Sequence, residues 1–108
     1  MYFHDSRTRT TKTLAPGVEA RTFWGDKMLV ALVDLAAGAV IPAHSHPYEQ
    51  VGTVLEGRFS FTIGDETREV GPGDVWVIPG GVTHSVTMGD TPGRVVEMFS
   101  PAREDYKY

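Results

Sequence analysis

The sequence predicts an all-β domain that closes into a barrel or jelly roll. Twelve glycines and seven prolines among 108 residues divide the chain into short segments, as is typical of all-β folds. The segments between these turn residues are rich in β-branched and aromatic residues, which favour strands. No window of helical length shows an apolar period of 3.6 residues. Closure into a barrel would leave few sheet edges exposed.

Seven strand-like segments are expected between residues 28 and 100. Residues 28–35, MLVALVDL, form a strand-like run. Residues 51–57 lead through Gly57 into residues 58–63, where Phe59, Phe61 and Ile63 alternate with polar residues. The turn-forming sequence at 64–66 then predicts a hairpin with residues 67–70. Further strands are expected in the segments 74–79, 82–88 and 94–100.

Charge and composition exclude several classes of partner. The net charge is -4 and no cluster of lysine or arginine is present, so nucleic-acid binding is not expected. The chain has no cysteine, which excludes a disulfide or a thiolate metal site. The longest apolar run, residues 28–33, ends at Asp34 and is too short to span a membrane. The polar, threonine-rich start lacks the apolar core of a secretion signal, so we expect a cytoplasmic protein without a membrane partner.

The length of the chain suits one domain with room for one site. We expect residues 1–13 to form an N-terminal arm, which could pair as an interface strand with a neighbouring subunit. Residues 14–108 are expected to form the single domain.

Three histidines point to a metal site. His44 and His46 are one residue apart, so in an extended strand their side chains share a face. Gln50 follows at the same parity, whereas Glu49 has the opposite parity and is the weaker candidate ligand. His84 comes from a second ordered segment. Three imidazoles and an amide oxygen suit a divalent transition metal, with nickel, zinc, iron, cobalt and manganese all possible.

The spacing of these ligands resembles the two motifs of the cupin family. The first spans residues 38–57, GAVIPAHSHPYEQVGTVLEG, with Gln50 where the family usually has glutamate. The second spans residues 73–88, with Met88 where the family has asparagine. This resemblance implies a small single-domain cupin with an RmlC-like jelly roll, a conical double-stranded β-helix barrel. It implies a metal near the barrel axis, held by His44, His46, Gln50 and His84.

Two stretches are similar to the cupins of pectin and alginate breakdown, namely residues 46–70 and 95–106. Enzymes of that group linearise a 4,5-unsaturated monouronate to a 5-keto-4-deoxyuronate, and they carry glutamine at the metal position. The resemblance implies a non-redox, metal-dependent enzyme with a small uronate as substrate. It implies active-site roles for Glu97, Phe99 and Arg103, with Glu97 replacing the aspartate typical of the group.

The residues themselves agree with these roles. In an extended strand Val95, Glu97 and Phe99 share a face, and a carboxylate between apolar neighbours is unusual unless it is paired or faces a wet cavity. Desolvation there would raise its pKa toward the range useful for proton transfer. The planar fork of Arg103 can hold a uronate carboxylate. Phe99 could pack on the sugar ring or exclude water.

Other functions remain open from the sequence. A metal-dependent dioxygenase would consume oxygen, and a polyketide-cyclase-like enzyme would need a larger cavity. A non-catalytic sugar-binding module would bind without turnover. Small cupins also resemble one another in pairing, so a homodimer is expected.

Overall fold

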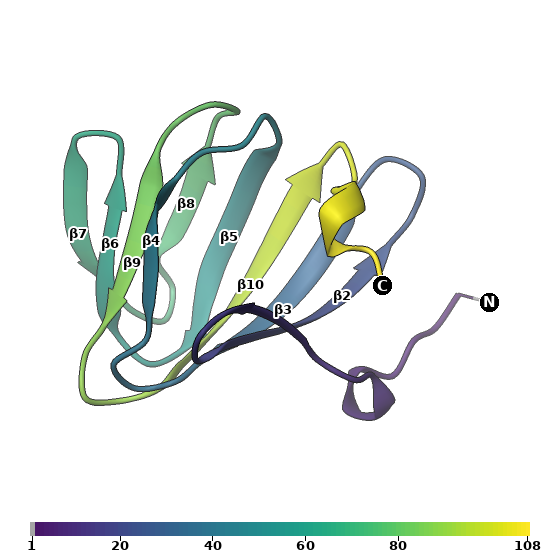
Figure 1. Ribbon diagram of the computed structural model, residues 1–108, viewed down its shortest axis with the longest axis horizontal. Coiled ribbons are helices and arrows are strands. Elements are labelled where there is room, and N and C mark those ends of the chain that lie inside the picture. The colour runs from purple at the N-terminus through teal and green to yellow at the C-terminus, as the bar shows by residue number, and fades with distance from the viewer. Residues whose placement is uncertain (1) are drawn as a thin grey trace.

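The computed structural model describes residues 2–108, which fold into two antiparallel β-sheets that face each other (Figure 1). Met1, the first residue of the expected arm, lies outside the described residues. The ten strands are β1 (Lys12–Ala15), β2 (Val18–Trp24), β3 (Leu29–Leu35), β4 (Val40–His44), β5 (Glu49–Glu56), β6 (Phe59–Ile63), β7 (Glu66–Val70), β8 (Val75–Ile78), β9 (His84–Met88) and β10 (Gly93–Ser100). Two short 3-10 helices, η1 (Ser6–Thr8) and η2 (Glu104–Tyr106), complete the described part. The all-β prediction is therefore confirmed.

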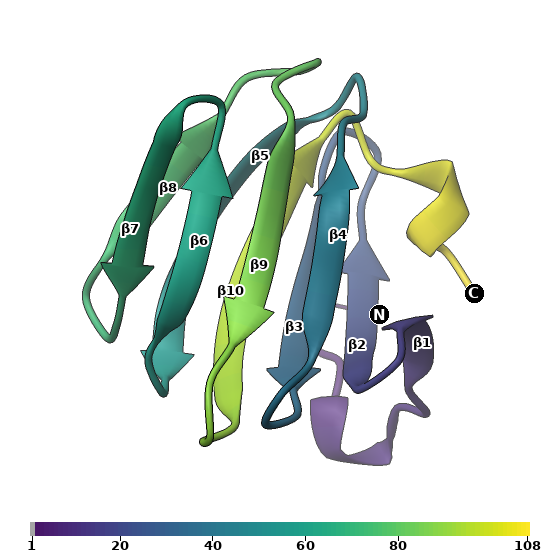
Figure 2. The same cartoon turned by 60° about the vertical axis from the view of Figure 1, so that its left-hand side comes forward.

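Six strands form the larger sheet in the order β1-β2-β3-β10-β5-β8, and four form the smaller sheet in the order β4-β9-β6-β7. Figure 2 shows the smaller sheet in front of the larger one. The predicted hairpin is present as β6 and β7, with Phe59 opposite Val70 and Ile63 opposite Glu66. Among residues 2–108, no helix is long and apolar enough to cross a membrane.

The core lies between the two sheets and follows the two-residue period of the strands. In β3 the buried residues alternate with half-buried ones, so Leu29, Ala31, Val33 and Leu35 point inward. Burying each larger aliphatic side chain of this kind stabilises the fold by about 1.5–3 kcal/mol. The smaller sheet supplies the facing layer, including Phe59, Phe61, Val86 and Met88.

The N-terminal residues are held against the same chain. Strand β1 begins at Lys12, which lies opposite Ala20 of β2. Before it, Asp5 caps η1 by accepting from the backbone N–H of Arg7 at 2.9 Å. The guanidinium of Arg9 lies 4.0 Å from the centre of the Tyr108 ring, which ties this segment to the C-terminal residues. A role for the arm in pairing with another subunit stays a prediction.

Candidate functional site

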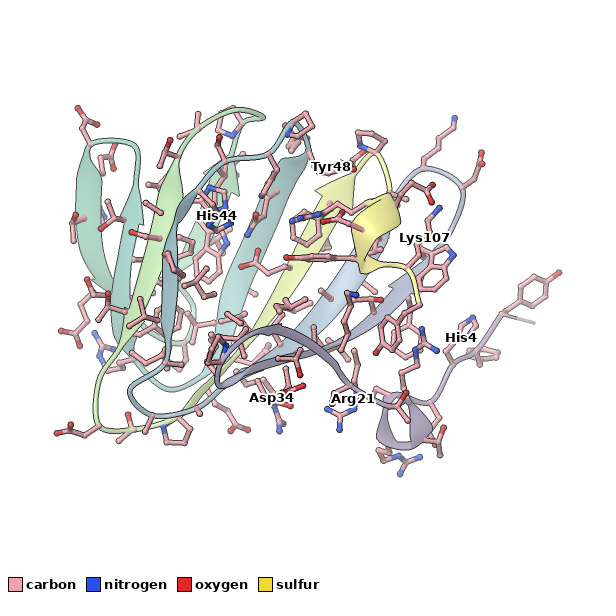
Figure 3. The ribbon with its side chains drawn as sticks, viewed as in Figure 1. His4, Arg21, Asp34, His44, Tyr48 and Lys107 are labelled. Atoms are coloured by element: carbon pink, nitrogen blue, oxygen red, sulfur yellow. The ribbon has the colours of Figure 1, made fainter. Side chains whose placement is uncertain are left out.

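Four of the residues singled out in the sequence meet at one end of the space between the sheets. His44 ends β4 and lies opposite His84, the first residue of β9. His46 lies in the connection that follows β4, and Gln50 is the second residue of β5. The histidines offer ligand atoms that lie within 4.8 Å of one another. Figure 3 shows His44 between the sheets, at the same end of the molecule as Tyr48.

His44 and His46 converge without sharing a strand, which differs from the single extended segment that the spacing suggested. Strand β4 ends at His44, and the chain bends before β5 begins at Glu49. Pro47 lies in this connection and lacks the backbone N–H that a strand ladder would use. Within β5 the expected parity holds, because Gln50 is 6% exposed and faces the interior while Glu49 is exposed on the outer face.

The three imidazole rings are held in one tautomer by the backbone. Nδ1 of His44 donates to the carbonyl of Pro42 at 2.9 Å. Nδ1 of His46 donates to the carbonyl of Tyr48 at 3.1 Å, and Nδ1 of His84 donates to the carbonyl two residues before it at 2.9 Å. A carbonyl can only accept, so the hydrogen of each neutral ring is on Nδ1. Each Nε2 therefore presents a lone pair, as a metal ligand must.

Two observations show that these atoms fit a cation. Nε2 of His84 is buried and has no hydrogen-bond partner, and an orphaned buried acceptor is costly unless something pairs with it. Nε2 of His46 lies 3.0 Å from Oε1 of Gln50, so two lone pairs face each other and a shared cation would satisfy both. Burial lowers the pKa of His46 and of His84, which favours the neutral form of both rings. The donor set suits a divalent transition metal of unspecified identity.

Glu97 is a buried carboxyl beside this cluster. It points inward from β10, is 7% exposed, and lies opposite Gly52 of β5, which in turn lies opposite Trp76 of β8. Nε1 of Trp76 donates to both carboxylate oxygens, at 3.1 and 3.0 Å. Burial raises the pKa of Glu97 to about 7, although the hydrogen bonds from Trp76 and Gln50 oppose the shift. The carboxyl can therefore both hold and release a proton near neutral pH.

Trp76 and Gly52 were not recognised as site residues from the sequence. A Cβ atom at Gly52 would overlap both the Glu97 carboxylate and the Trp76 indole nitrogen. The glycine therefore makes room for the indole N–H to reach across β5 to the acid. A glycine inside a strand often marks such a close approach. Gly52 was therefore the feature of the sequence that could have indicated this contact.

Arg103 is buried among aromatic rings at the same end of the cavity. Its guanidinium carbon lies 3.7 Å from the centre of the Tyr106 ring, 4.9 Å from that of Phe99 and 5.2 Å from that of Tyr48. Its Nε and Nη2 donate to Asp105 at 3.1 and 2.7 Å, and this hydrogen bonding lowers the pKa of Asp105. Asp105 therefore occupies part of the Arg103 guanidinium. Both hydrogens on Nη1 and one hydrogen on Nη2 remain available to bind an anion.

Phe99 links the arginine to the histidines. Its ring is 3% exposed and meets the ring of His46 edge to face, with the centres 5.8 Å apart. All seven residues expected in the site therefore lie around one end of the space between the sheets. Phe99 therefore contributes an apolar surface between the ring of His46 and the guanidinium of Arg103.

The cavity that these residues border has a volume of about 360 Å³. Its polar end is lined by His44, Gln50, His84, Glu97 and Arg103. The rest of the wall is apolar and comes from both sheets and from β1, including Leu14, Val33, Leu35, Phe59, Val86 and Val95. The arrangement can hold a cation, attract an anionic group and move a proton, all within one small chamber.

Comparisons with known proteins agree with this geometry. Residues 31–99 match the model of the cupin domain. Over 107 residues the chain is 28% identical to the pectin degradation protein KdgF of Dickeya dadantii, covering 97% of this chain and 96% of that protein.

Solved structures support the same assignment. The structure of KdgF from Halomonas sp. superposes with a TM-score of 0.88 at 26% identity, covering 97% of each chain. An RmlC-like cupin from Shewanella frigidimarina superposes with a TM-score of 0.91 at 24% identity, over 99% of this chain and 96% of that one. The second likeness concerns the fold alone, and it confirms the RmlC-like jelly roll that the motifs implied.

Proposed function

The chain belongs to the cupin family, and from that premise we propose that it is a metal-dependent enzyme that linearises a 4,5-unsaturated monouronate to a 5-keto-4-deoxyuronate. The observation that carries the proposal is the meeting of three Nε2 lone pairs, a buried carboxyl and a buried guanidinium at one end of one cavity. The near full-length similarity to a protein of pectin degradation supports a uronate as substrate. We further propose, from composition alone, that the protein acts in the cytoplasm.

Four residues would hold the metal. His44, His46 and His84 supply imidazole nitrogens, and Gln50 supplies a neutral amide oxygen. Because these four ligands are neutral, they would leave the charge of a divalent ion uncompensated, and the ion would supply Lewis-acid stabilisation of negative charge on sugar oxygens.

Arg103 orients the substrate in this proposal. The hydrogens that Asp105 leaves free on its two Nη atoms can hold the carboxylate of the uronate by charge-assisted hydrogen bonds. Tyr106 lies against the guanidinium and keeps its plane fixed. Phe99, which borders the same space, would pack on a face of the sugar ring and exclude water.

Glu97 moves the proton. Opening of the ring breaks the bond between C1 and the ring oxygen, so C1 becomes an aldehyde and the former ring oxygen becomes an enol at C5. Conversion of that enol to the ketone needs a proton at C4 and loss of the enol proton, so the overall change is an isomerisation. The geometry of the Trp76–Glu97 pair supports Glu97 as the group that carries this proton, a role worth about 10²–10⁴-fold in rate.

The large apolar part of the cavity supports a second candidate. Most of the wall below the polar end is made of aliphatic and aromatic side chains, which suit a bulkier and less polar ligand than a monouronate. A polyketide-cyclase-like reaction, which forms an aromatic product from a poly-keto substrate, would use that surface. It would still use the same metal ligands at the polar end.

The test is an assay of purified, metal-loaded protein with an unsaturated monouronate, following the loss of the conjugated absorbance of the substrate. We expect a rate well above the spontaneous one, which chelation abolishes and added metal restores. A rate equal to the spontaneous one would overturn the proposed reaction. In that case, tight binding of the uronate would favour a sugar-binding module, and conversion of a poly-keto substrate would favour the second candidate. Oxygen consumption would instead indicate a dioxygenase.

A further inference from the structure

A tryptophan on the edge strand of the larger sheet contacts the buried acid across an intervening strand. Trp76 of β8, Gly52 of β5 and Glu97 of β10 lie directly opposite one another in register. Figure 1 shows β5 between the other two strands. Strands two places apart in a sheet are separated by about 9.6 Å, so their side chains normally do not meet. Here Nε1 of Trp76 donates to both carboxyl oxygens of Glu97, at 3.1 and 3.0 Å.

Gly52 has no backbone reason to be a glycine. Its φ is not positive, and it lies in the regular ladder of β5. A glycine inside a strand costs about 0.5–1 kcal/mol relative to alanine. A Cβ atom at this position would lie 2.5 Å from Nε1 of Trp76 and would overlap the carboxyl of Glu97. The missing side chain therefore serves the contact between the indole and the acid.

The indole is held in place by residues other than Glu97. Trp76 is 5% exposed, and its ring meets that of Phe61 from β6 at an angle of 66°, with the centres 4.8 Å apart. The ring of Phe59 lies 6.4 Å away in a similar orientation. Edge-to-face pairs of this kind add about 0.5–1.5 kcal/mol each. Packing against the smaller sheet therefore sets the direction of the indole N–H.

The carboxyl of Glu97 has few other partners that could fix its orientation. Within residues 2–108 no ion pair includes it. A further hydrogen bond comes from Gln50, whose Oε1 faces His46 in the metal cluster. Ordering a long side chain costs up to about 2 kcal/mol, and a misplacement of about 1 Å in an active site can cost about 100-fold in rate. Trp76 is therefore the partner outside the metal cluster that can hold the acid in place.

We propose that Trp76 is a positioning residue, which holds the carboxyl of Glu97 in the orientation in which it carries the proton, and that Gly52 is the residue that permits this contact. The effect on turnover rests on the function proposed above, whereas the contact itself does not. Phenylalanine could fill the same part of the core but has no donor, so the indole N–H is the group that matters. Trp76 also borders the cavity, so the test has to separate positioning from packing and from contact with the substrate.

Steady-state kinetics of Trp76→Phe make this separation. The substitution removes the N–H and keeps an aromatic ring in the core. We expect kcat with the unsaturated monouronate to fall by about 10–100-fold, with KM and metal content unchanged. In a Glu97→Gln background the same substitution should have no further effect, because no carboxyl remains to be positioned. Trp24→Phe, at a position that is 40% exposed, is the matched control and should change nothing.

Two kinetic results would overturn the proposal. An equal loss of kcat in the wild-type and Glu97→Gln backgrounds would show that Trp76 acts by packing. A loss confined to KM would show that it acts by touching the substrate.

Gly52→Ala tests the same arrangement from the strand between. The added Cβ atom should displace the carboxyl from the indole, so kcat should fall by a similar factor with metal retained. Combining it with Trp76→Phe should cost little more than either substitution alone, because both remove one contact. Gly89→Ala is the control, since a Cβ atom there meets nothing within 4 Å. Losses that multiply in the double variant would contradict a shared role.

A spectroscopic readout does not depend on turnover. The chain has two tryptophans, so isotope-labelled, metal-loaded protein gives two indole N–H signals in its nuclear magnetic resonance spectrum. Glu97→Gln leaves one amide oxygen in place of two carboxyl oxygens, so the signal of Trp76 should move while that of Trp24 stays. A Trp76 signal that does not move would overturn the proposal whatever the activity. A wild type without turnover but with the expected shift would overturn the proposed reaction alone and support the positioning of Glu97 by Trp76.

Discussion

Two groups of residues border the polar end of the cavity, and they are held in place in different ways. The imidazole cluster (His44, His46 and His84) is fixed locally, since each ring donates to a backbone carbonyl two residues away. The C-terminal flank (Glu97, Phe99 and Arg103) is fixed by side chains, some of them distant in sequence, such as Trp76. The first group is therefore preformed by the backbone, and the second depends on its neighbours for both position and charge.

The largest expected effect comes from breaking the imidazole cluster. His84→Ala removes the buried Nε2 that has no partner within the chain, so we expect metal affinity to fall by more than about 100-fold and turnover to fall to the spontaneous rate. Elemental analysis after dialysis measures the first effect. His4→Ala, on the exposed arm, should leave metal content unchanged. Full metal occupancy in H84A would contradict the assignment of this ligand.

The next largest effect is expected from Glu97→Gln, which should lower turnover without removing the metal and so separates the role of the C-terminal flank from that of the imidazole cluster. Glu97→Gln keeps the shape of the side chain and an acceptor for Trp76 but cannot transfer a proton, so turnover should fall by about 10²–10⁴-fold with metal retained. Glu49→Gln is the matched control, because it lies on the outer face of β5 beside Gln50 and should change neither property. Loss of metal from E97Q would show that the two groups are not separate.

The pH dependence of stability distinguishes the two groups, because burial shifts the pKa of Glu97 and the pKa values of the histidines in opposite directions. In metal-free protein, burial raises the pKa of Glu97 from 4.5 to about 7, so its contribution to stability is fully present below pH 4.5 and is lost as pH rises through 7. The loss is on the order of 3 kcal/mol. Burial lowers the pKa of His46 and His84, so their contribution is lost as pH falls below 6.5.

Urea unfolding of wild type and E97Q at several pH values isolates the Glu97 contribution. E97Q should become more stable than wild type as pH rises from 4.5 to 8, by about the free energy given above. A stability difference that does not change with pH would mean that the carboxyl ionises freely in the folded protein.

The smallest effect is expected from removing the carboxylate of Asp105, which holds the guanidinium of Arg103 in place. Asp105→Asn removes the charged partner of Nε and Nη2, so the guanidinium loses its fixed direction. A loss of about 1 kcal/mol in substrate binding, typical of a partly exposed ion pair, raises KM by about fivefold with little change in kcat. Glu104→Gln, at an exposed position paired with Lys107, is the control. Equal kinetics in D105N and wild type would mean that ring stacking alone positions Arg103.

The same contrast explains what could be predicted from the sequence. The ligand spacing of the imidazole cluster and the parity of Gln50 depend on short stretches of chain, and the structure brings these side chains together. The hairpin of β6 and β7 depends on a turn and an alternation that are equally local. His46 was placed on a strand because nothing in the alternation of residue types reveals where β4 ends.

The surroundings of the flank could not be predicted in this way. The hydrogen bond from Trp76 to Glu97 depends on the register of three strands and on the room left by the missing Cβ atom of Gly52. That Asp105 occupies part of the Arg103 fork depends on the turn of η2.

We propose above that His44, His46, His84 and Gln50 hold one divalent ion inside the cavity. A crystal structure of protein loaded with nickel or zinc, with anomalous scattering measured at the absorption edge of the metal, tests it most directly. We expect a single strong anomalous peak bonded to the three Nε2 atoms and to Oε1 of Gln50. A cavity without anomalous density in fully loaded crystals, or a peak bonded to other residues, would contradict it.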